Sequence, residues 1–147
     1  QHCIAAAMWL VALIPLCSCG IVSSGASEPA VVRTPDSRFK DLYQQSYPWE
    51  PRYIWLTIPG VSKPLRVHYV DEGPAYANET LLLLHGTPTW SYLWRKMVPS
   101  FLKAGYRVVM FDFIGFGRSD KLTAIDAYTH DLHVGTLMDL VQTLDLK

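Results

Sequence analysis

Cysteine is missing from most of the sequence. The three cysteines, Cys3, Cys17 and Cys19, all lie close to the N-terminus, and none follows them. A disulfide framework and a thiolate metal site are therefore excluded for the remainder of the chain, as is a cysteine nucleophile.

An excess of charge of either sign is missing as well. The chain has 13 basic and 13 acidic side chains, so its formal net charge is zero. It does not create the positive field that attracts nucleic acid or an anionic membrane surface, and we expect no nucleic-acid partner. Half of the residues are apolar, and 5 tryptophans and 8 tyrosines are among them. This composition suits one hydrophobic core or an apolar ligand pocket.

The segment from Cys3 to Cys19 reads CIAAAMWLVALIPLCSC and carries no charge. Its length falls between a signal-peptide core of about 7 to 15 residues and a membrane-spanning helix of about 20. Pro15 and the small residues after it favour a processed export signal over a retained helix. We therefore predict an export signal with a tether over residues 1–28 and a folded domain over 29–147.

The end of this segment allows two kinds of export. LCSCG resembles a bacterial lipoprotein box with Cys19 as the lipidated residue, although Cys17 stands where a small residue is usual. Lipidation would tether the protein to a membrane without spanning it. The alternative is a secretory signal cut before Ser27, which would release the protein into the periplasm. Residues 20–31 are small and polar enough for a flexible tether, and because the chain begins at Gln1 we expect residues to precede it.

Four segments are predicted to be strands. Residues 53–58 and 65–70 flank a Pro59-Gly60 turn, and the alternation of polar and apolar residues over 65–70 predicts a hairpin with one solvent-exposed face. Residues 80–84 and 107–111 read TLLLL and RVVMF. Continuous apolar runs of this kind are typical of strands buried on both faces of a parallel sheet.

Two helices are predicted beside these strands. Residues 90–104 carry apolar side chains three and four positions apart, and Pro99 should kink that helix or split its last turn. Residues 129–146 show the same spacing, with Thr129 or Asp126 as the N-cap. After an extended, irregular lead-in, these elements predict an α/β fold in which an antiparallel hairpin leads into a parallel sheet with flanking helices.

Two loops follow the carboxyl ends of the predicted parallel strands, where open α/β sheets bind ligands. They are residues 85–91, HGTPTWS, and residues 112–120, DFIGFGRSD. In the first loop Gly86 permits close approach of the backbone, and the N–H of Thr87 can serve as one donor of an oxyanion hole. We also expect a cis Thr87-Pro88 peptide bond, which would aim that N–H.

Residues 32–147 resemble the N-terminal portion of haloalkane dehalogenases, within the α/β-hydrolase superfamily. The segment HGTPTWSYLWR is fairly specific to the dehalogenases, whereas the pattern D-x-x-G-x-G-x-S at 112–119 is common to the whole superfamily. The matching segments are RTPDSRF (33–39), HYVDEGP (68–74), LLLLHGTPTWSYLWRKMVP (81–99), GYRVVMFDFIGFGRSDK (105–121) and AYTHDLHV (127–134).

The resemblance implies a hydrolase that needs no organic cofactor and no metal. An aspartate displaces halide from a small apolar substrate, and a histidine-activated water hydrolyses the resulting ester. We expect the catalytic residues beyond Lys147: that aspartate at its nucleophile elbow, the acid and the histidine. A helical cap domain is expected there as well. The family usually has Asn or a carboxylic acid after His-Gly to hold the halide. Thr87 offers one side-chain donor where an amide offers two, but its backbone N–H keeps its role, supported by Gly86 and His85.

Other residues have competing interpretations. His85 as a catalytic base is disfavoured, because a histidine at a strand end more often braces the loop through its ring nitrogens. His130 and His133 are three residues apart, but without a carboxylate or thiolate cluster they indicate a solvated helix face rather than a metal site. Asp112 is expected to accept N–H bonds from its own loop. Trp90 could line a substrate pocket.

Three hypotheses about the chain remain open from the sequence. The first is a dehalogenase-like hydrolase, with an epoxide or ester hydrolase of the same fold as its close alternative. The second is a ligand-binding protein without catalysis, because fold does not dictate function. An Asp followed by Trp after the next strand would favour the dehalogenase, and a Ser there would favour an esterase.

The third is an incomplete reading frame. A sheet that stops after two parallel strands leaves an open apolar edge that promotes aggregation. We therefore predict that the isolated 147-residue chain is inactive and poorly soluble. Measurable halide release by the purified chain would contradict this prediction.

Overall fold

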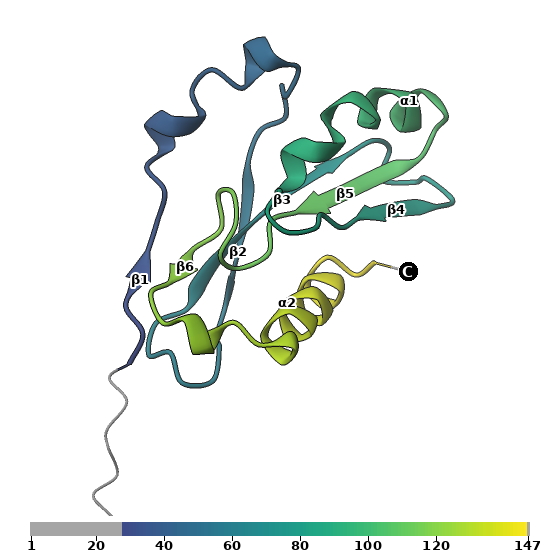
Figure 1. The fold of residues 1–147 in the computed structure, drawn as a ribbon. Coiled ribbons are helices and arrows are strands. Elements are labelled where there is room, and N and C mark those ends of the chain that lie inside the picture. The colour runs from purple at the N-terminus through teal and green to yellow at the C-terminus, as the bar shows by residue number, and fades with distance from the viewer. Residues whose placement is uncertain (1–27, 147) are drawn as a thin grey trace, which may run out of the picture.

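A mixed four-stranded sheet forms the centre of the computed structural model, which describes residues 28–146 (Figure 1). Its strands lie in the order β2-β3-β5-β4, and only β4 and β5 are parallel. The predicted hairpin leading into a parallel pair is thus confirmed. The strands are β2 (Arg52–Leu56), β3 (Leu65–Glu72), β4 (Thr80–Leu83) and β5 (Arg107–Phe111).

Helices lie on both sides of this sheet (Figure 1). On one side is α1 (Val98–Lys103), preceded by a 3-10 helix, η3 (Ser91–Lys96). On the other side is α2 (His130–Thr143), whose N-cap is Thr129. The Thr129 hydroxyl accepts a hydrogen bond from the Leu132 amide at 3.1 Å, which decides between the two predicted caps.

The helix predicted over residues 90–104 is instead two short helices. Pro99 lies in the first turn of α1, where its missing N–H costs no intrahelical bond. The proline therefore begins a new helix and does not kink a continuous one. Gly105 ends α1 with a φ of 91°, and the Tyr106 amide donates back to the Phe101 carbonyl at 3.2 Å.

Two clusters of buried side chains pack against the two faces of the sheet. β5 contributes to both, because successive side chains of a strand point to opposite faces. Phe111 joins Leu140 of α2 in the first cluster. Met110 joins Val98 of α1 in the second. All four side chains are fully buried.

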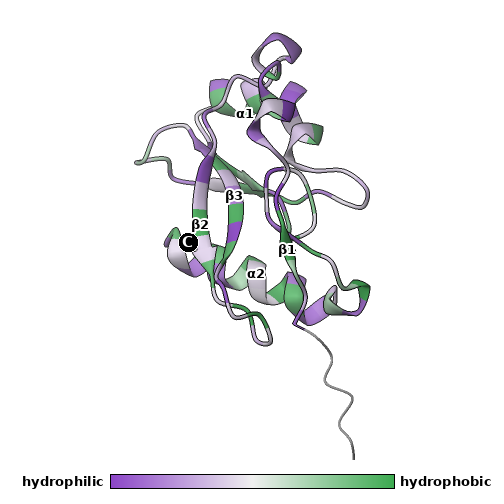
Figure 2. Ribbon diagram, turned by 90° about the vertical axis from the view of Figure 1, so that its left-hand side faces the viewer, coloured by the Kyte–Doolittle hydropathy of each residue, from purple (hydrophilic) through white to green (hydrophobic). Residues whose placement is uncertain are grey.

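Two predictions about strand burial are wrong. The leucines of β4 are only partly buried, and Leu84 is 41% exposed, because among the described strands β4 pairs with β5 alone and lies at the sheet edge. The polar face of β3 is not exposed to solvent either. Arg66 is 8% exposed and His68 is fully buried. Figure 2 shows hydrophilic as well as hydrophobic residues along β3, so hydrophilic character there does not mean exposure to solvent. The loop after β5 covers this face, as described below.

The lead-in is more ordered than predicted. β1 (Val31–Val32) pairs antiparallel with β6 (Lys121–Leu122). The Thr123 amide also donates to the Ala30 carbonyl at 3.0 Å, so the last residues of the expected tether are part of the fold. Three short 3-10 helices complete the chain: η1 (Asp36–Phe39), η2 (Tyr43–Gln45) and η4 (Ile125–Ala127).

The predicted export signal and Cys19 lie outside the described residues, which begin at residue 28. Within residues 28–146, no helix has both the length and the apolar character needed to cross a membrane.

Truncation of Leu140 tests the packing of α2 on the sheet. Leu140→Ala should lower the free energy of unfolding by about 2–4 kcal/mol, because it leaves a cavity in a fully buried site. Met138, on the same helix, is 59% exposed. Met138→Ala should change stability by less than about 0.5 kcal/mol. Urea denaturation followed by circular dichroism measures both, and equal effects would contradict the assigned helix faces.

Candidate functional site

The two loops singled out in the sequence lie at one edge of the sheet. β4 and β5 are parallel with Leu83 opposite Met110, so the loops that follow them leave the sheet side by side. Residues 85–91 connect β4 to η3 and residues 112–120 connect β5 to β6. This edge is where α/β sheets bind ligands.

Thr87 lies in an exposed turn outside the strand ladder. The Thr87-Pro88 peptide bond is cis, as predicted. The Gly86 carbonyl closes the turn by accepting the Thr89 amide at 2.8 Å and the Thr89 hydroxyl at 2.6 Å. Among residues 28–146, neither the amide nor the hydroxyl of Thr87 has a hydrogen-bond partner. Both groups are therefore free to meet a ligand.

His85 braces the two loops against each other. Its Nε2 accepts the Phe113 amide at 3.0 Å, which assigns the proton to Nδ1. Nδ1 then donates to the Gly86 carbonyl at 3.1 Å. Both ring nitrogens are thus engaged with backbone groups, and the rings of Phe113 and Phe116 contact the imidazole edge-on. An imidazole whose two nitrogens are both engaged in this way braces the loops, which agrees with the structural interpretation of His85.

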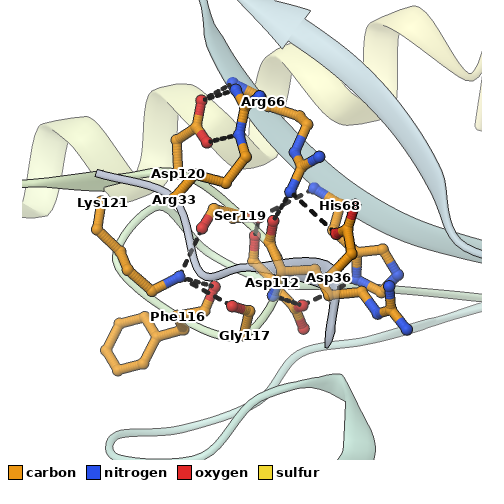
Figure 3. Close-up of polar contacts among 11 residues, drawn as sticks. Arg33, Asp36, Arg66, His68, Asp112, Phe116, Gly117, Ser119, Asp120 and Lys121 are labelled. Atoms are coloured by element: carbon orange, nitrogen blue, oxygen red, sulfur yellow. Dashed lines mark hydrogen bonds and ion pairs between the residues drawn. The ribbon is translucent and has the colours of Figure 1, made fainter. Parts of the chain in front are cut away.

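Asp112 is the buried centre that joins both loops to β3 (Figure 3). Its Oδ1 accepts the Ser91 amide at 2.8 Å. Its Oδ2 accepts the Arg118 amide and the Nδ1 of His68, each at 2.8 Å. The expected role of Asp112 as an acceptor of its own loop's N–H is confirmed, and the bond to Ser91 extends that role to the Thr87 loop.

The glycines of the second loop give Asp112 its space. Gly117 has a φ of 46°, and a Cβ there would overlap Asp112 Oδ2. Gly115 has a φ of 100°, and a Cβ there would collide with the ring of Tyr128. Larger residues at either position would push the carboxylate or the tyrosine away.

A second carboxylate, Asp120, anchors the lead-in to the same loop. Arg33 binds it through two nitrogens at 2.7 and 2.8 Å. The Arg66 amide also donates to it, at 2.8 Å. Lys121 caps the loop by donating to the Gly117 and Ser119 carbonyls at 2.8 and 2.7 Å (Figure 3).

Hydrogen bonds keep both carboxylates ionised. Burial alone would raise the pKa of Asp112, but the bonds from His68, Arg118 and Ser91 outweigh it and hold that pKa below its ordinary value. Burial likewise opposes the ionised form of Asp120, while the Arg33 guanidinium and the Arg66 amide lower its pKa below the ordinary value.

Several of these residues were not found from the sequence. The sequence did not single out His68, Ser91, Tyr47 or Asp120. In the structure, the Tyr47 and Ser91 hydroxyls are buried and form a hydrogen bond of 2.8 Å. For His68, the available signal was the alternation of polar and apolar residues along β3. A polar residue on a covered strand face needs a hydrogen-bond partner.

Trp90, which the sequence suggested for a substrate pocket, packs among other aromatic rings of the described chain. It stacks on Tyr92 at a centroid distance of 5.4 Å and contacts Tyr47 and Phe39 at 5.6 and 5.7 Å. Trp90 therefore joins the lead-in to η3, and its role in a substrate pocket stays a prediction.

The two histidines of α2 differ in their surroundings. His130 is exposed, as predicted for a solvated helix face. His133 is half-buried, with its ring 5.3 Å from that of Phe113. Burial, and then the charges of His85 and His130, lower its pKa. Within the described part of the chain, no three histidine, cysteine or carboxylate side chains are grouped to hold a metal ion.

Comparison with known proteins agrees with this arrangement. Residues 79–147 match the family model described as alpha/beta hydrolase fold. A haloalkane dehalogenase of Psychrobacter cryohalolentis is 47% identical over 117 residues, which are 80% of this chain and 37% of that protein. Haloalkane dehalogenase 1 of Mycobacterium tuberculosis is 52% identical over 116 residues, or 79% of this chain and 37% of the relative.

Solved structures give the same result. The tetrameric haloalkane dehalogenase of Paraglaciecola agarilytica superposes with a TM-score of 0.73 at 45% identity, over 80% of this chain and 38% of that one. The fold and the loops therefore define an α/β hydrolase. Within that class the chain belongs to the haloalkane dehalogenase family, and it spans 37% of the length of the curated relatives described above.

Asp112→Asn tests the buried carboxylate. The amide keeps the shape but has an acceptor oxygen at one end only, so it cannot accept from Ser91 at one end and from His68 and Arg118 at the other. We therefore expect the free energy of unfolding to fall by about 3–5 kcal/mol. Asp126→Asn, at an exposed position, is the control and should change it by less than about 0.5 kcal/mol. Urea denaturation measures both, and a neutral Asp112→Asn would show that the network is not important for stability.

The lowered pKa of Asp120 predicts a pH dependence. A carboxylate whose folded-state pKa is depressed contributes stability above the unfolded value of about 3.9 and loses it as pH falls through the folded pKa. Asp120→Asn should therefore be less stable than the wild type at pH 7, and the difference should shrink as pH is lowered from about 5 to 2. Unfolding curves across this range check the convergence, and a constant difference would contradict it.

Proposed function

We propose that the protein is a hydrolase that cleaves carbon–halogen bonds in small apolar molecules. The identity of 46–52% to haloalkane dehalogenases supports this function. The observation that carries the proposal is the Thr87 turn, whose amide lies outside the strand ladder at the ligand-binding edge of the sheet and has no partner among the described residues.

The proposed chemistry has two balanced steps. A carboxylate attacks the carbon that bears the halogen, so a carbon–oxygen bond forms while the carbon–halogen bond breaks and halide leaves with the electron pair. Water then attacks the carbonyl carbon of the ester, which gives an alcohol, the regenerated carboxylate and a proton. Neither step requires an oxidant or a reductant. The family resemblance assigns the nucleophilic carboxylate, the acid and the histidine to positions outside these 147 residues.

Thr87 would contribute through its backbone and its side chain. The amide stabilises negative charge that develops on the ester oxygen, because a fixed N–H needs no reorganisation during the reaction. The hydroxyl donates a single hydrogen bond to the departing halide. His85 and Gly86 would act as positioning residues, since the His85 bonds to Phe113 and Gly86 fix the turn.

The alternative is an epoxide or ester hydrolase of the same fold. The observation that favours it is Thr87 itself, which replaces the amide or acid that usually holds halide in the family. A likeness to a thioesterase domain at 21% identity and a TM-score of 0.54 shows the shared fold alone.

Export to the periplasm or to a lipid-anchored position at a membrane is part of the proposal. It rests on the uncharged apolar segment between Cys3 and Cys19. Mass spectrometry of the mature N-terminus in the source cell tests it. A diacylglyceryl group on Cys19 supports the anchor, and an unprocessed N-terminus contradicts export.

Substitution of Thr87 in the complete gene product tests the function. Halide release from 1-bromobutane is compared with hydrolysis of p-nitrophenyl butyrate and of styrene oxide. Thr87→Val keeps the branched shape and the amide but removes the hydroxyl, so kcat/KM for 1-bromobutane should fall about 10-fold or more. Thr87→Asn adds a donor and should restore or raise that activity.

The selectivity of the effect distinguishes the alternatives. Hydrolysis of the butyrate ester should be nearly unchanged in Thr87→Val, because that reaction uses the amide alone. Absence of halide release together with fast ester or epoxide hydrolysis would overturn the dehalogenase assignment. Absence of all three activities would favour a binding protein.

A further inference from the structure

A cavity is lined by residues of the β2–β3 turn, of the segment around η4 and of α2. These segments lie near one another in Figure 1. The cavity volume of about 620 Å³ falls within the range of about 300–1,000 Å³ that is usual for small-molecule sites. None of its lining residues belongs to the Thr87 loop.

The walls of this cavity are apolar and its rim is acidic. Leu122 and Leu132 line the cavity and also belong to the hydrophobic core, and Ile58 and Pro59 of the β2–β3 turn line it as well. The lining includes no lysine, arginine or histidine. Its charged members are four carboxylates, Glu28, Asp126, Asp131 and Asp139.

Gly135 of α2 also lines the cavity. It lies in the interior of the helix, where glycine costs about 0.5–1 kcal/mol relative to alanine. Among residues 28–146, a Cβ at this position would meet nothing within 4 Å. A larger side chain there would therefore extend into open space beside the cavity.

We propose that this cavity binds a small organic cation with an apolar body, such as an alkylammonium compound. The apolar walls would bury the body, since burial yields about 25 cal/mol per Å². The carboxylates would hold the charged end at the rim. A metal ion fits less well, because no three of the described carboxylates and histidines are grouped as ligands.

Two basic groups lie beside the rim without lining it. Lys63 lies close enough to help lower the pKa of Glu28, although the main cause is the hydrogen bond from the Ser62 amide. His130 Nδ1 is 3.7 Å from Asp131 Oδ1. The four lining carboxylates outnumber these two basic groups, so the rim keeps an excess of acidic side chains.

The test is a titration of the complete gene product with hexyltrimethylammonium at pH 8 and constant ionic strength, followed by nitrogen-15 NMR. 1-Hexanol and hexanoate are the neutral and anionic comparisons. We expect saturable shifts of the Gly135 and Ala124 amides, with the cation bound more tightly than hexanol and hexanoate bound least. Equal affinity for the three compounds, or no saturable shift, would overturn the proposal.

Two variants locate the site and its charge. Gly135→Leu fills the cavity and should weaken cation binding at least about 10-fold while the melting temperature stays equal or rises, because leucine favours the helix. Val134→Leu, outside the lining, is the matched control. Asp131→Asn with Asp139→Asn should weaken cation binding about 3-fold and leave hexanol binding unchanged. Unchanged cation binding in Gly135→Leu would contradict the site.

Discussion

The buried pair of Asp112 and His68 is the interaction on which the candidate site depends. Both side chains are completely buried and lie 2.8 Å apart. A buried carboxylate is costly unless hydrogen bonds compensate it, and here His68, the Ser91 amide and the Arg118 amide do so. Because Ser91 follows the Thr87 turn and Arg118 belongs to the second loop, one carboxylate fixes both loops relative to β3.

The strands and helices were largely predictable because their periods are local properties of the sequence. The hairpin, the parallel pair and the helix over 130–143 follow from apolar spacing and from a threonine cap. An interruption of the helix at Pro99 was predicted, although not as the start of a second helix, and the ordering of the lead-in was not predicted. That ordering depends on Arg33 binding Asp120, a contact across 87 positions that has no local signal.

The candidate site was predicted in outline but not in its support. The Thr87 turn and the roles of His85 and Asp112 followed from loop position and from the family resemblance. His68 was missed because a polar residue at an alternate position of a strand reads as solvent-exposed. Only the tertiary structure shows that the loop after β5 covers it. Trp90 packs in an aromatic cluster with Tyr92, a contact that spacing alone does not show.

Amide hydrogen exchange tests most directly whether Asp112 holds the two loops. The Ser91 and Arg118 amides should exchange at least about 100-fold more slowly than unstructured amides, because each donates to a buried carboxylate. In Asp112→Asn, whose amide keeps one acceptor oxygen, at least one of the two should lose most of this protection, while the Val109 amide within the sheet should retain its own. Fast exchange of Ser91 and Arg118 in the wild type, or unchanged protection of both in the variant, would contradict the account.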